Sequence, residues 1–246
     1  MDRLLYIAMS GAKETLRAQT ANNHNLANAS TTGFRADLSA FQSRAVVGSG
    51  FASRVYATNA TTGWDTTSGA QQQTGRDLDI SIQGDGFIAV QAPDGREAYT
   101  RAGDLRVDAN GMLTTAAGHP VLGDGGAITV PPNTSLGIAP DGTISIVPLG
   151  QGPETTANIA RIKLVNPDPR TVERGEDGLF RQRDGTDAPA DAAVRISSGV
   201  LESSNVNVAD AMVNMIELAR HFDLQVKAMR SAEDNGAAAS QLLRMG

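Results

Sequence analysis

The chain has 246 residues, with 21 Lys and Arg against 27 Asp and Glu, 40% hydrophobic residues and 4% aromatic residues. A net charge of −6 argues against a protein that binds nucleic acid through a basic surface. Cysteine is absent, which excludes disulfides, thiolate catalysis and cysteine-bound zinc.

The N-terminal segment has the pattern of an amphipathic helix over residues 3–28, without Pro. Seven positions recur at alternating spacings of four and three: Leu5, Met9, Ala12, Leu16, Gln19, Asn23 and Leu26. This spacing places them on one helix face. Because three of the seven are small or amide residues, we expect a helix that is poorly stable alone and that packs closely against neighbours.

The same segment also resembles a short signal peptide. However, its apolar run, residues 4–9, is shorter than the roughly 7–15 residues of a signal core. We therefore expect no cleaved signal peptide. No stretch of the sequence approaches the ~20 apolar residues of a membrane-spanning helix.

A break follows the first helix. Asn28 tolerates a left-handed position at the helix C-terminus, Gly33 supplies positive φ, and Phe34 is a candidate anchor for the outgoing chain. Residues 37–74 are polar and rich in Thr, Ser and Gln. We expect them to form an extended, strand-poor connector that stays mobile until something packs on it.

Residues 75–200 have an all-β pattern of short apolar runs separated by turn residues. Residues 78–82 alternate between apolar and polar, and Gly84-Asp85-Gly86 turns the chain into the next run. Residues 108–111, Asp-Ala-Asn-Gly, predict a hairpin in which Asn110 and Gly111 both adopt positive φ.

The C-terminal segment predicts a second amphipathic helix over residues 206–232, about 40 Å long at 1.5 Å per residue. Seven positions again repeat at four-three spacing: Val208, Met212, Met215, Ala219, Phe222, Val226 and Met229. Asn205 or Asn207 is the expected N-cap. Gly236 is a candidate interruption before Leu242 and Leu243.

These patterns together predict an α+β fold, with two long terminal α-helices packed as a coiled coil around or under a mainly-β central domain. The expected organisation is an N-terminal assembly helix and cap over 1–36, the connector over 37–74, an all-β domain over 75–200 and a C-terminal assembly helix over 201–246. The apolar helix faces either close a helical hairpin within the chain or pair with other copies.

No motif predicts a catalytic, cofactor or metal site. Residues 84–89 match the relaxed dinucleotide pattern G-x-G-x-x-A, but a strand pattern follows where that site requires a helix. Residues 108–111 resemble a fragment of a calcium loop without its further ligands. The three histidines, at 24, 119 and 221, lie in separate segments. We therefore expect no enzyme and no cofactor.

Separated motifs resemble the flagellar axial family of rod, hook and hook-associated proteins. Residues 21–35, Ala-Asn-Asn-His-Asn-Leu-Ala-Asn-Ala-Ser-Thr-Thr-Gly-Phe-Arg, are similar to the N-terminal signature of that family, and residues 199–216 to its closing signature. Four intervening stretches agree as well: residues 78–87, 99–103, 108–111 and 118–123. Residues 1–12 and the chain length resemble the proximal-rod type, with the distal-rod type as its close rival.

The resemblance implies a structural subunit of the flagellar basal-body rod. Terminal helices of many subunits would form concentric layers of a helical tube that crosses the periplasm and transmits torque. The implied partners are other copies, other rod subunits and the flagellar type III export apparatus, with no nucleic acid, no small-molecule substrate and no embedding in the membrane. The alternatives are a distal-rod or hook-type subunit and, in a different class, a monomeric secreted β-domain adhesin or binding protein.

The residues expected at the assembly interface lie on the helix faces and in the two signatures. They are Leu5, Met9, Ala12, Leu16, Leu26, Asn28, Gly33, Phe34, Asn205, Val208, Met212, Met215, Phe222, Val226 and Met229.

Overall fold

The computed structural model describes residues 3–45, 55–150 and 155–245. The chain divides into two compact units. The helical unit comprises Met1–Ala29, Ala36–Asp65 and Val206–Gly246, and the β unit comprises Ser30–Arg35 and Thr66–Asn205. The chain thus leaves the helical unit after its first helix, contributes six residues to the β unit and returns.

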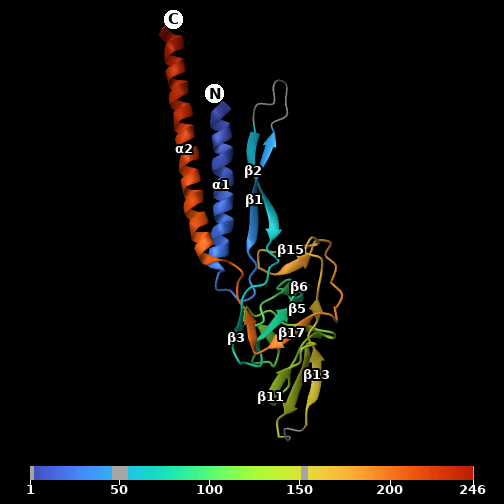
Figure 1. The fold of residues 1–246 in the computed structure, drawn as a ribbon. Coiled ribbons are helices and arrows are strands. Elements are labelled where there is room, and N and C mark those ends of the chain that lie inside the picture. The colour runs from blue at the N-terminus through green and yellow to red at the C-terminus, as the bar shows by residue number, and fades with distance from the viewer. Residues whose placement is uncertain (1–2, 46–54, 151–154, 246) are drawn as a thin grey trace. The chain divides into compact units, whose positions relative to one another are not determined.

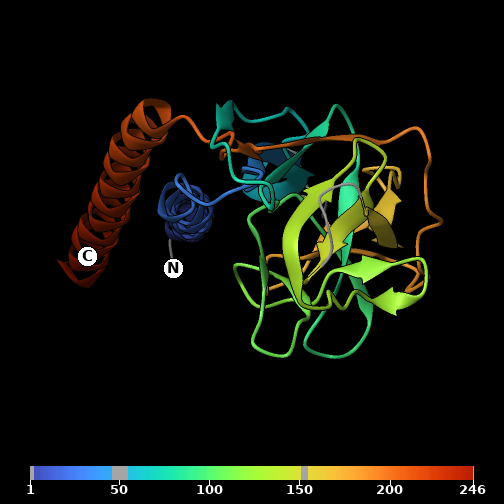
Figure 2. The same ribbon diagram turned by 90° about the horizontal axis from the view of Figure 1, so that it is seen from below.

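The helical unit contains two antiparallel helices and one β-hairpin (Figures 1 and 2). Helix α1 spans Arg3–Ala27 and helix α2 spans Val208–Met245. Strands β1 (Asp37–Ala45) and β2 (Val55–Trp64) pair antiparallel and pack along α1. The Ser10 hydroxyl donates to the Ala57 carbonyl over 3.3 Å and so ties α1 to β2.

Side-chain amides cap the C-terminus of α1 and the N-terminus of α2. The Asn28 Nδ2 donates to the His24 carbonyl over 2.9 Å, which satisfies one of the last carbonyls of α1. The left-handed conformation expected for Asn28 is wrong, because every positive φ in the described residues belongs to a glycine. At α2, the Asn207 Oδ1 accepts the Ala209 N–H at 3.0 Å as the N-cap. Gly236 does not interrupt α2, since one glycine costs a helix only about 1 kcal/mol.

The expected fold class is wrong in its account of the helices. The N-terminal helix is short, with 25 residues against 38 in α2, and helices make up 26% of the chain. The two helices pack with the β1–β2 hairpin in a unit of their own, so they do not form a simple two-helix coiled coil. The central part of the chain is mainly β.

Residues 37–74, expected to be strand-poor, contain β1, β2 and β3 (Gln71–Gln73). Residues 46–54 of this segment lie outside the described part of the chain. The hairpin escapes a pattern search because many of its side chains are polar and exposed on both faces. Its support comes from α1, a contact distant in the sequence.

The β unit consists of short strands whose pairings are all antiparallel in the described ranges. A five-stranded sheet has the order β14-β5-β6-β16-β15, a three-stranded sheet the order β11-β12-β13, and the other strands form pairs. After β3, the strands are β4 (Ile80–Gln83), β5 (Phe87–Gln91), β6 (Glu97–Thr100), β7 (Leu105–Val107), β8 (Leu113–Thr115), β9 (Leu122–Gly123), β10 (Gly126–Ala127), β11 (Asn133–Ile138), β12 (Thr143–Pro148), β13 (Ala157–Arg161), β14 (Leu164–Val165), β15 (Val172–Arg174), β16 (Phe180–Gln182), β17 (Arg195–Ser198) and β18 (Val200–Glu202).

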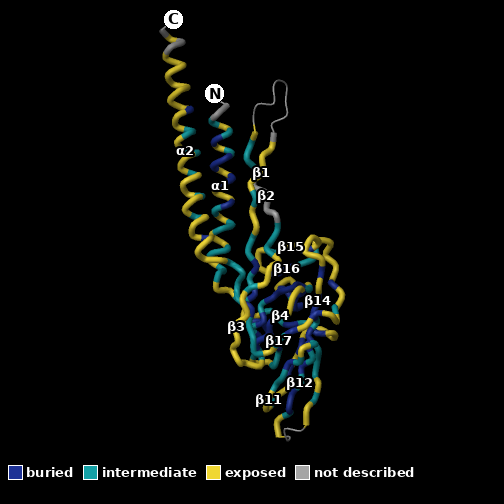
Figure 3. Tube along the Cα trace, viewed as in Figure 1, coloured by how far each residue is buried: buried dark blue, intermediate teal, exposed yellow. Residues whose placement is uncertain are grey.

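The core of the β unit is aliphatic. Ile80, Ile88, Leu105, Leu113 and Ile144 are completely buried, and the cluster around them consists of Ile, Val, Leu and Ala. The dark-blue segments of the β unit in Figure 3 mark this interior, whereas most of α2 is yellow. The β unit therefore buries its own apolar residues, and the helical unit leaves many exposed.

The predicted turns form, with one difference in conformation. Gly84 and Gly86 both have positive φ between β4 and β5, as expected for a turn. At residues 108–111, Gly111 has positive φ but Asn110 does not. The Asp108 N–H donates to the Met112 carbonyl over 2.9 Å, which leaves a three-residue loop with glycine at its left-handed position. The Asp108 carboxylate stabilises this longer loop by accepting the Asn110 and Met112 N–H groups, both at 2.8 Å.

Candidate assembly interface

Small residues form the contact between α1 and α2. Ala18 on α1 and Ala211 on α2 are buried. A Cβ on Gly11 would lie 2.9 Å from the amide carbon of the Gln225 side chain, so the Gln225 side chain of α2 packs directly against Gly11 of α1. The Asn22 Nδ2 donates to the Ala211 carbonyl over 2.8 Å and fixes the register of the pair.

On α2, the predicted stripe is split between the helix contact and the surface. Met215, Phe222, Val226 and Met229 are half-buried. Val208 and Met212 are exposed by 41% and 48%. The buried and half-buried positions begin at Ala211, one residue before Met212, and continue with Met215, Leu218 and Phe222. One residue corresponds to about 100° around a helix, so α1 covers one side of a wider apolar arc.

On α1, the predicted stripe is divided in the same way. Ala12 is buried, and Leu5 and Leu26 are half-buried. Met9 and Leu16 are exposed by 53% and 48%. The face toward α2 instead contains Gly11, Ala18 and Asn22. Met9 and Leu16 therefore belong to the outer face of α1.

Both helices carry large apolar side chains on their outer surfaces. Each is between 41% and 59% exposed. They are Tyr6, Met9 and Leu16 on α1, and Val208, Met212, Val213, Ile216 and Leu224 on α2. Sequence periodicity missed Tyr6, Val213, Ile216 and Leu224, because it identified a single face on each helix. A contiguous set of exposed apolar residues is typical of an interaction surface.

A groove of about 450 Å³ lies within the helical unit, bounded by α1, the start of β1 and α2. Its lining residues are Ala18, Ala21, Asn22, Asn25, Ala36, Asp37, Leu38, Ser39, Phe41, Asn214, Glu217, Leu218 and His221. The Asn25 side chain holds β1 beside α1, donating to the Asp37 carbonyl over 3.0 Å and accepting its N–H over 2.7 Å. His24 Nδ1 lies 2.7 Å from an Asp37 carboxylate oxygen.

The predicted residues Gly33, Phe34 and Asn205 are engaged within the β unit. The Gly33 N–H donates to the Glu202 carbonyl over 2.8 Å, and a Cβ on Gly33 would lie 2.3 Å from the Arg101 carbonyl carbon. The Arg174 guanidinium lies 4.7 Å from the centre of the Phe34 ring, a cation–π contact. The Asn205 N–H donates to the Phe34 carbonyl over 3.3 Å.

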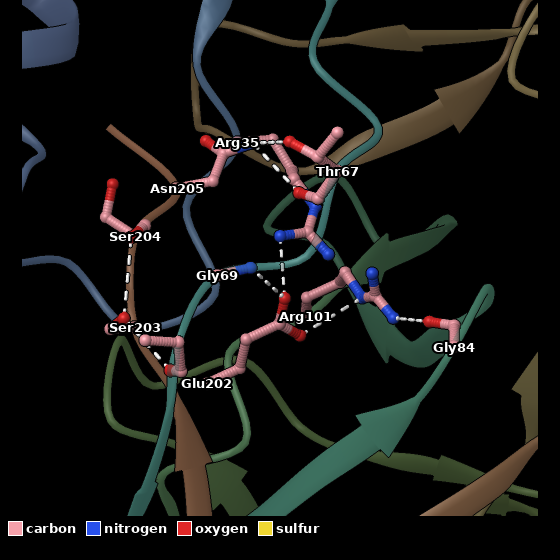
Figure 4. A network of polar contacts seen from close by, with 10 residues as sticks. Arg35, Thr67, Gly69, Gly84, Arg101, Glu202, Ser203, Ser204 and Asn205 are labelled. Carbon is pink, nitrogen blue, oxygen red and sulfur yellow. Dashed lines mark hydrogen bonds and ion pairs between the residues drawn. The ribbon is translucent and has the colours of Figure 1, made fainter. Parts of the chain in front are cut away.

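A buried charge cluster joins the same segments (Figure 4). Arg35 Nη1 lies 2.6 Å from Glu202 Oε1, with side chains that are 0% and 1% exposed. Arg101 Nε lies 3.4 Å from Glu202 Oε2 and is 3% exposed. The Gly69 N–H also donates to Glu202 Oε1 over 2.9 Å. One carboxylate thus neutralises part of two buried guanidinium charges and binds the chain at residue 69.

The electrostatics of this cluster follow from its burial. Desolvation and the neighbouring Arg35 charge together lower the pKa of Arg101 to about 10, although the Glu202 and Asp85 charges act in the opposite direction. Sequence reasoning did not single out Arg35, Arg101 or Glu202 as functional. The available signal was their position, because Arg35 and Glu202 each lie inside a stretch that resembles a family signature.

The described residues contain no helix long and apolar enough to cross a membrane. Nor do they contain a group of three or more His, Asp or Glu side chains placed to hold a metal ion.

Two family models match the chain. The model described as the flagellar hook protein FlgE/F/G D1 domain matches residues 81–146, within the β unit. The model described as the flagellar basal body rod FlgEFG protein C-terminal region matches residues 197–242, which include most of α2.

Curated relatives match over all or nearly all of the chain. The flagellar basal-body rod protein FlgF of Salmonella typhimurium is 46% identical over 251 residues, covering 100% of both chains. FlgF of Escherichia coli is 45% identical with the same coverage. The basal-body rod protein FlgG of Bacillus subtilis is 32% identical, covering 95% of this chain and 96% of its own length. The FlgF proteins are therefore more similar to this chain than that FlgG protein is. The chain belongs to the family of flagellar basal-body rod proteins, as a structural subunit of the FlgF type.

Proposed function

We propose that this rod subunit polymerises through its helical unit into the helical shaft that crosses the periplasm and transmits torque. In this proposal, residues 1–36 and 201–246 are the assembly segments, and the partners are other copies and other rod subunits. The chain has a structural rather than an enzymatic role, as its rod-protein relatives suggest.

The observation that carries the proposal is the contrast between the two units. The β unit buries its aliphatic residues, whereas the paired helices expose Met9, Met212 and Ile216 by 53%, 48% and 54%. Burying one such side chain contributes roughly 1.5–3 kcal/mol before entropy costs. Pairing of α1 with α2 within the chain therefore still leaves apolar surface exposed for neighbouring subunits. The helices can pair within the chain and also bind other copies.

Substitutions on the exposed arc test the proposal. Met212→Asp or Ile216→Asp places a charge where a neighbour would pack, so we expect no rods, seen by electron microscopy, and no motility. Circular dichroism of the purified variants should be unchanged, because both side chains are exposed within the subunit. Ser231→Asp, another exposed position on α2, is the matched control. Normal rods with Met212→Asp and Ile216→Asp would overturn the proposal.

Met215→Asp and Phe222→Asp have a different expected outcome. Both side chains are half-buried, on the side of α2 that packs against α1. An introduced carboxylate should therefore separate the two helices and reduce helix content in the purified chain, as well as prevent assembly. Unchanged helix content would contradict this assignment of the contact face.

We further propose that the chain is exported unprocessed through the flagellar type III pathway. Support comes from the short apolar run at residues 4–9 and from the family resemblance. Intact-mass measurement of the subunit recovered from isolated basal bodies should show an N-terminus that still contains Leu4–Met9. A mass corresponding to cleavage after this run would refute the export route.

A further inference from the structure

We propose that the groove of the helical unit receives the outer face of α1 from a second copy of this chain. The inference rests on the proposed function and specifies one contact by which a subunit meets the next. It uses two surfaces of the helical unit, the groove described above and a stripe formed by Met9, Lys13 and Leu16, here called the α1 stripe.

The groove combines an apolar floor with an acidic side. Leu38 and Phe41 from β1 are exposed by 44% and 53%, although both line a concave surface. Glu217 is exposed on its α2 side and forms no ion pair with the residues that the structure describes. Asp37, from β1, also lines the groove, and its carboxylate lies 2.7 Å from His24 Nδ1.

The α1 stripe has the complementary composition. Met9, Lys13 and Leu16 follow each other at spacings of four and three, so they share one helix face. Met9 and Leu16 are 53% and 48% exposed, and Lys13 between them is exposed as well. Lys13 forms no ion pair within the described ranges. The α1 stripe thus has one cation between two apolar side chains. The groove has the matching groups, which are the apolar side chains of Leu38 and Phe41 and the carboxylate of Glu217.

The occupant must come from another copy. The stripe lies on the face of α1 opposite to Gly11, which packs on α2. Its centre is about nine residues from the centre of the groove-lining part of α1, or about 13 Å along the helix. A subunit therefore cannot fill its own groove. Because stripe and groove are different surfaces, each subunit can donate one and accept the other, and such heterologous contacts extend into an open filament.

Charge reversal tests the contact in the full chain. Lys13→Glu and Glu217→Lys each place like charges together, so each should weaken self-association by about tenfold in sedimentation velocity over a concentration series. The double variant Lys13→Glu/Glu217→Lys restores opposite charges and should recover association to near the original value. Lys227→Glu makes the same charge change at an exposed position outside both surfaces and should have little effect.

Cysteine pairs test proximity directly, because the chain has no cysteine of its own. A mixture of Met9→Cys and Phe41→Cys proteins should form a mixed disulfide dimer under mild oxidation, in excess over a mixture of Phe41→Cys and Ser231→Cys.

The inference fails if both single charge reversals leave association unchanged, if the double variant shows no recovery, or if the two cysteine mixtures cross-link equally. Should Ile216→Asp still abolish association in that case, the groove contact alone is overturned and the assembly function stands. Normal rods with Ile216→Asp and an unassociated wild-type chain would overturn both.

Discussion

Replacement of Glu202 by Gln should destabilise the β unit strongly. Glu202 is 1% exposed, and the two guanidinium groups that it contacts, Arg35 and Arg101, are 0% and 3% exposed. Glutamine keeps the size of the side chain but removes the negative charge. Breaking a buried ion pair from one side costs about 3–5 kcal/mol, because a charge is left in the interior without compensation. Here two positive charges would remain.

The expected change is measurable by scanning calorimetry and urea unfolding of the full chain. For a domain of roughly 150–250 residues, 1 kcal/mol corresponds to about 2–4 °C in Tm, so we expect the β-unit transition to fall by about 6–20 °C. Adding Arg35→Met to Glu202→Gln removes one of the two uncompensated charges. The double variant should therefore be more stable than Glu202→Gln alone, the non-additivity expected of residues in contact.

Glu173→Gln provides the matched control. Its side chain is 63% exposed and 3.9 Å from Arg183, an arrangement that contributes at most about 1 kcal/mol. The reasoning is refuted if Glu202→Gln changes the unfolding free energy no more than Glu173→Gln does. It is also refuted if the effects of Arg35→Met and Glu202→Gln simply add.

Three further changes test local features of the chain. Gly33→Ala should destabilise the β unit by more than about 1 kcal/mol in urea unfolding. Gly33 has φ of 66°, and the Cβ of an alanine there would lie 2.3 Å from backbone atoms of Arg101. Asn207→Ala should reduce the stability of α2 by about 1 kcal/mol through loss of its N-cap, measured by thermal denaturation followed by circular dichroism at 222 nm. Asp177→Asn should cost about 0.5–1 kcal/mol at pH 7 and less at pH 2, measured by urea unfolding at both pH values. The two hydrogen bonds from Arg181 hold the pKa of Asp177 below its usual 3.8. The stability that the ion pair contributes is therefore present above pH 3.8 and is lost as the pH falls through the lowered pKa.

Each of these changes has a control or a contradicting result. Gly118 has φ of 89° with open space around its Cβ position, so Gly118→Ala measures backbone strain without the clash. Equal losses from the two glycine variants would contradict the close-approach argument. An unchanged melting curve for Asn207→Ala would contradict the capping role. A loss in Asp177→Asn that is the same at pH 2 and pH 7 would contradict the ion-pair explanation.

The helices could be predicted from the sequence, but the rotation of their contact faces could not. The four-three repeat identifies α2 because apolar residues recur with the helical period. The apolar arc of α2, however, runs from Ala211 past Met212 to Ile216, which is wider than one partner helix covers. A repeat cannot show which side of such an arc α1 takes. That choice depends on where small residues such as Gly11 allow close approach.

Contacts between distant segments were the least predictable features. The β1–β2 hairpin consists largely of polar residues, and α1 supports it through contacts such as the bond between Ser10 and Ala57. The ion pair of Arg35 with Glu202 joins two segments near opposite ends of the chain. By contrast, Gly84 and Gly111 marked turns correctly, since a local need for positive φ is visible in the residue type itself.

The path of the chain through the β unit has a mechanical consequence. Residues 30–35 follow α1, and residues 203–205 lead into α2. Both segments are attached at Glu202. Residues 30–35 are attached through the hydrogen bond from the Gly33 N–H to the Glu202 carbonyl, and residues 203–205 directly follow Glu202 in the chain. Tension on either terminal helix therefore enters the β unit at the same residue, Glu202. Because the two segments share this anchorage, neither helix can be pulled away without straining the attachment of the other.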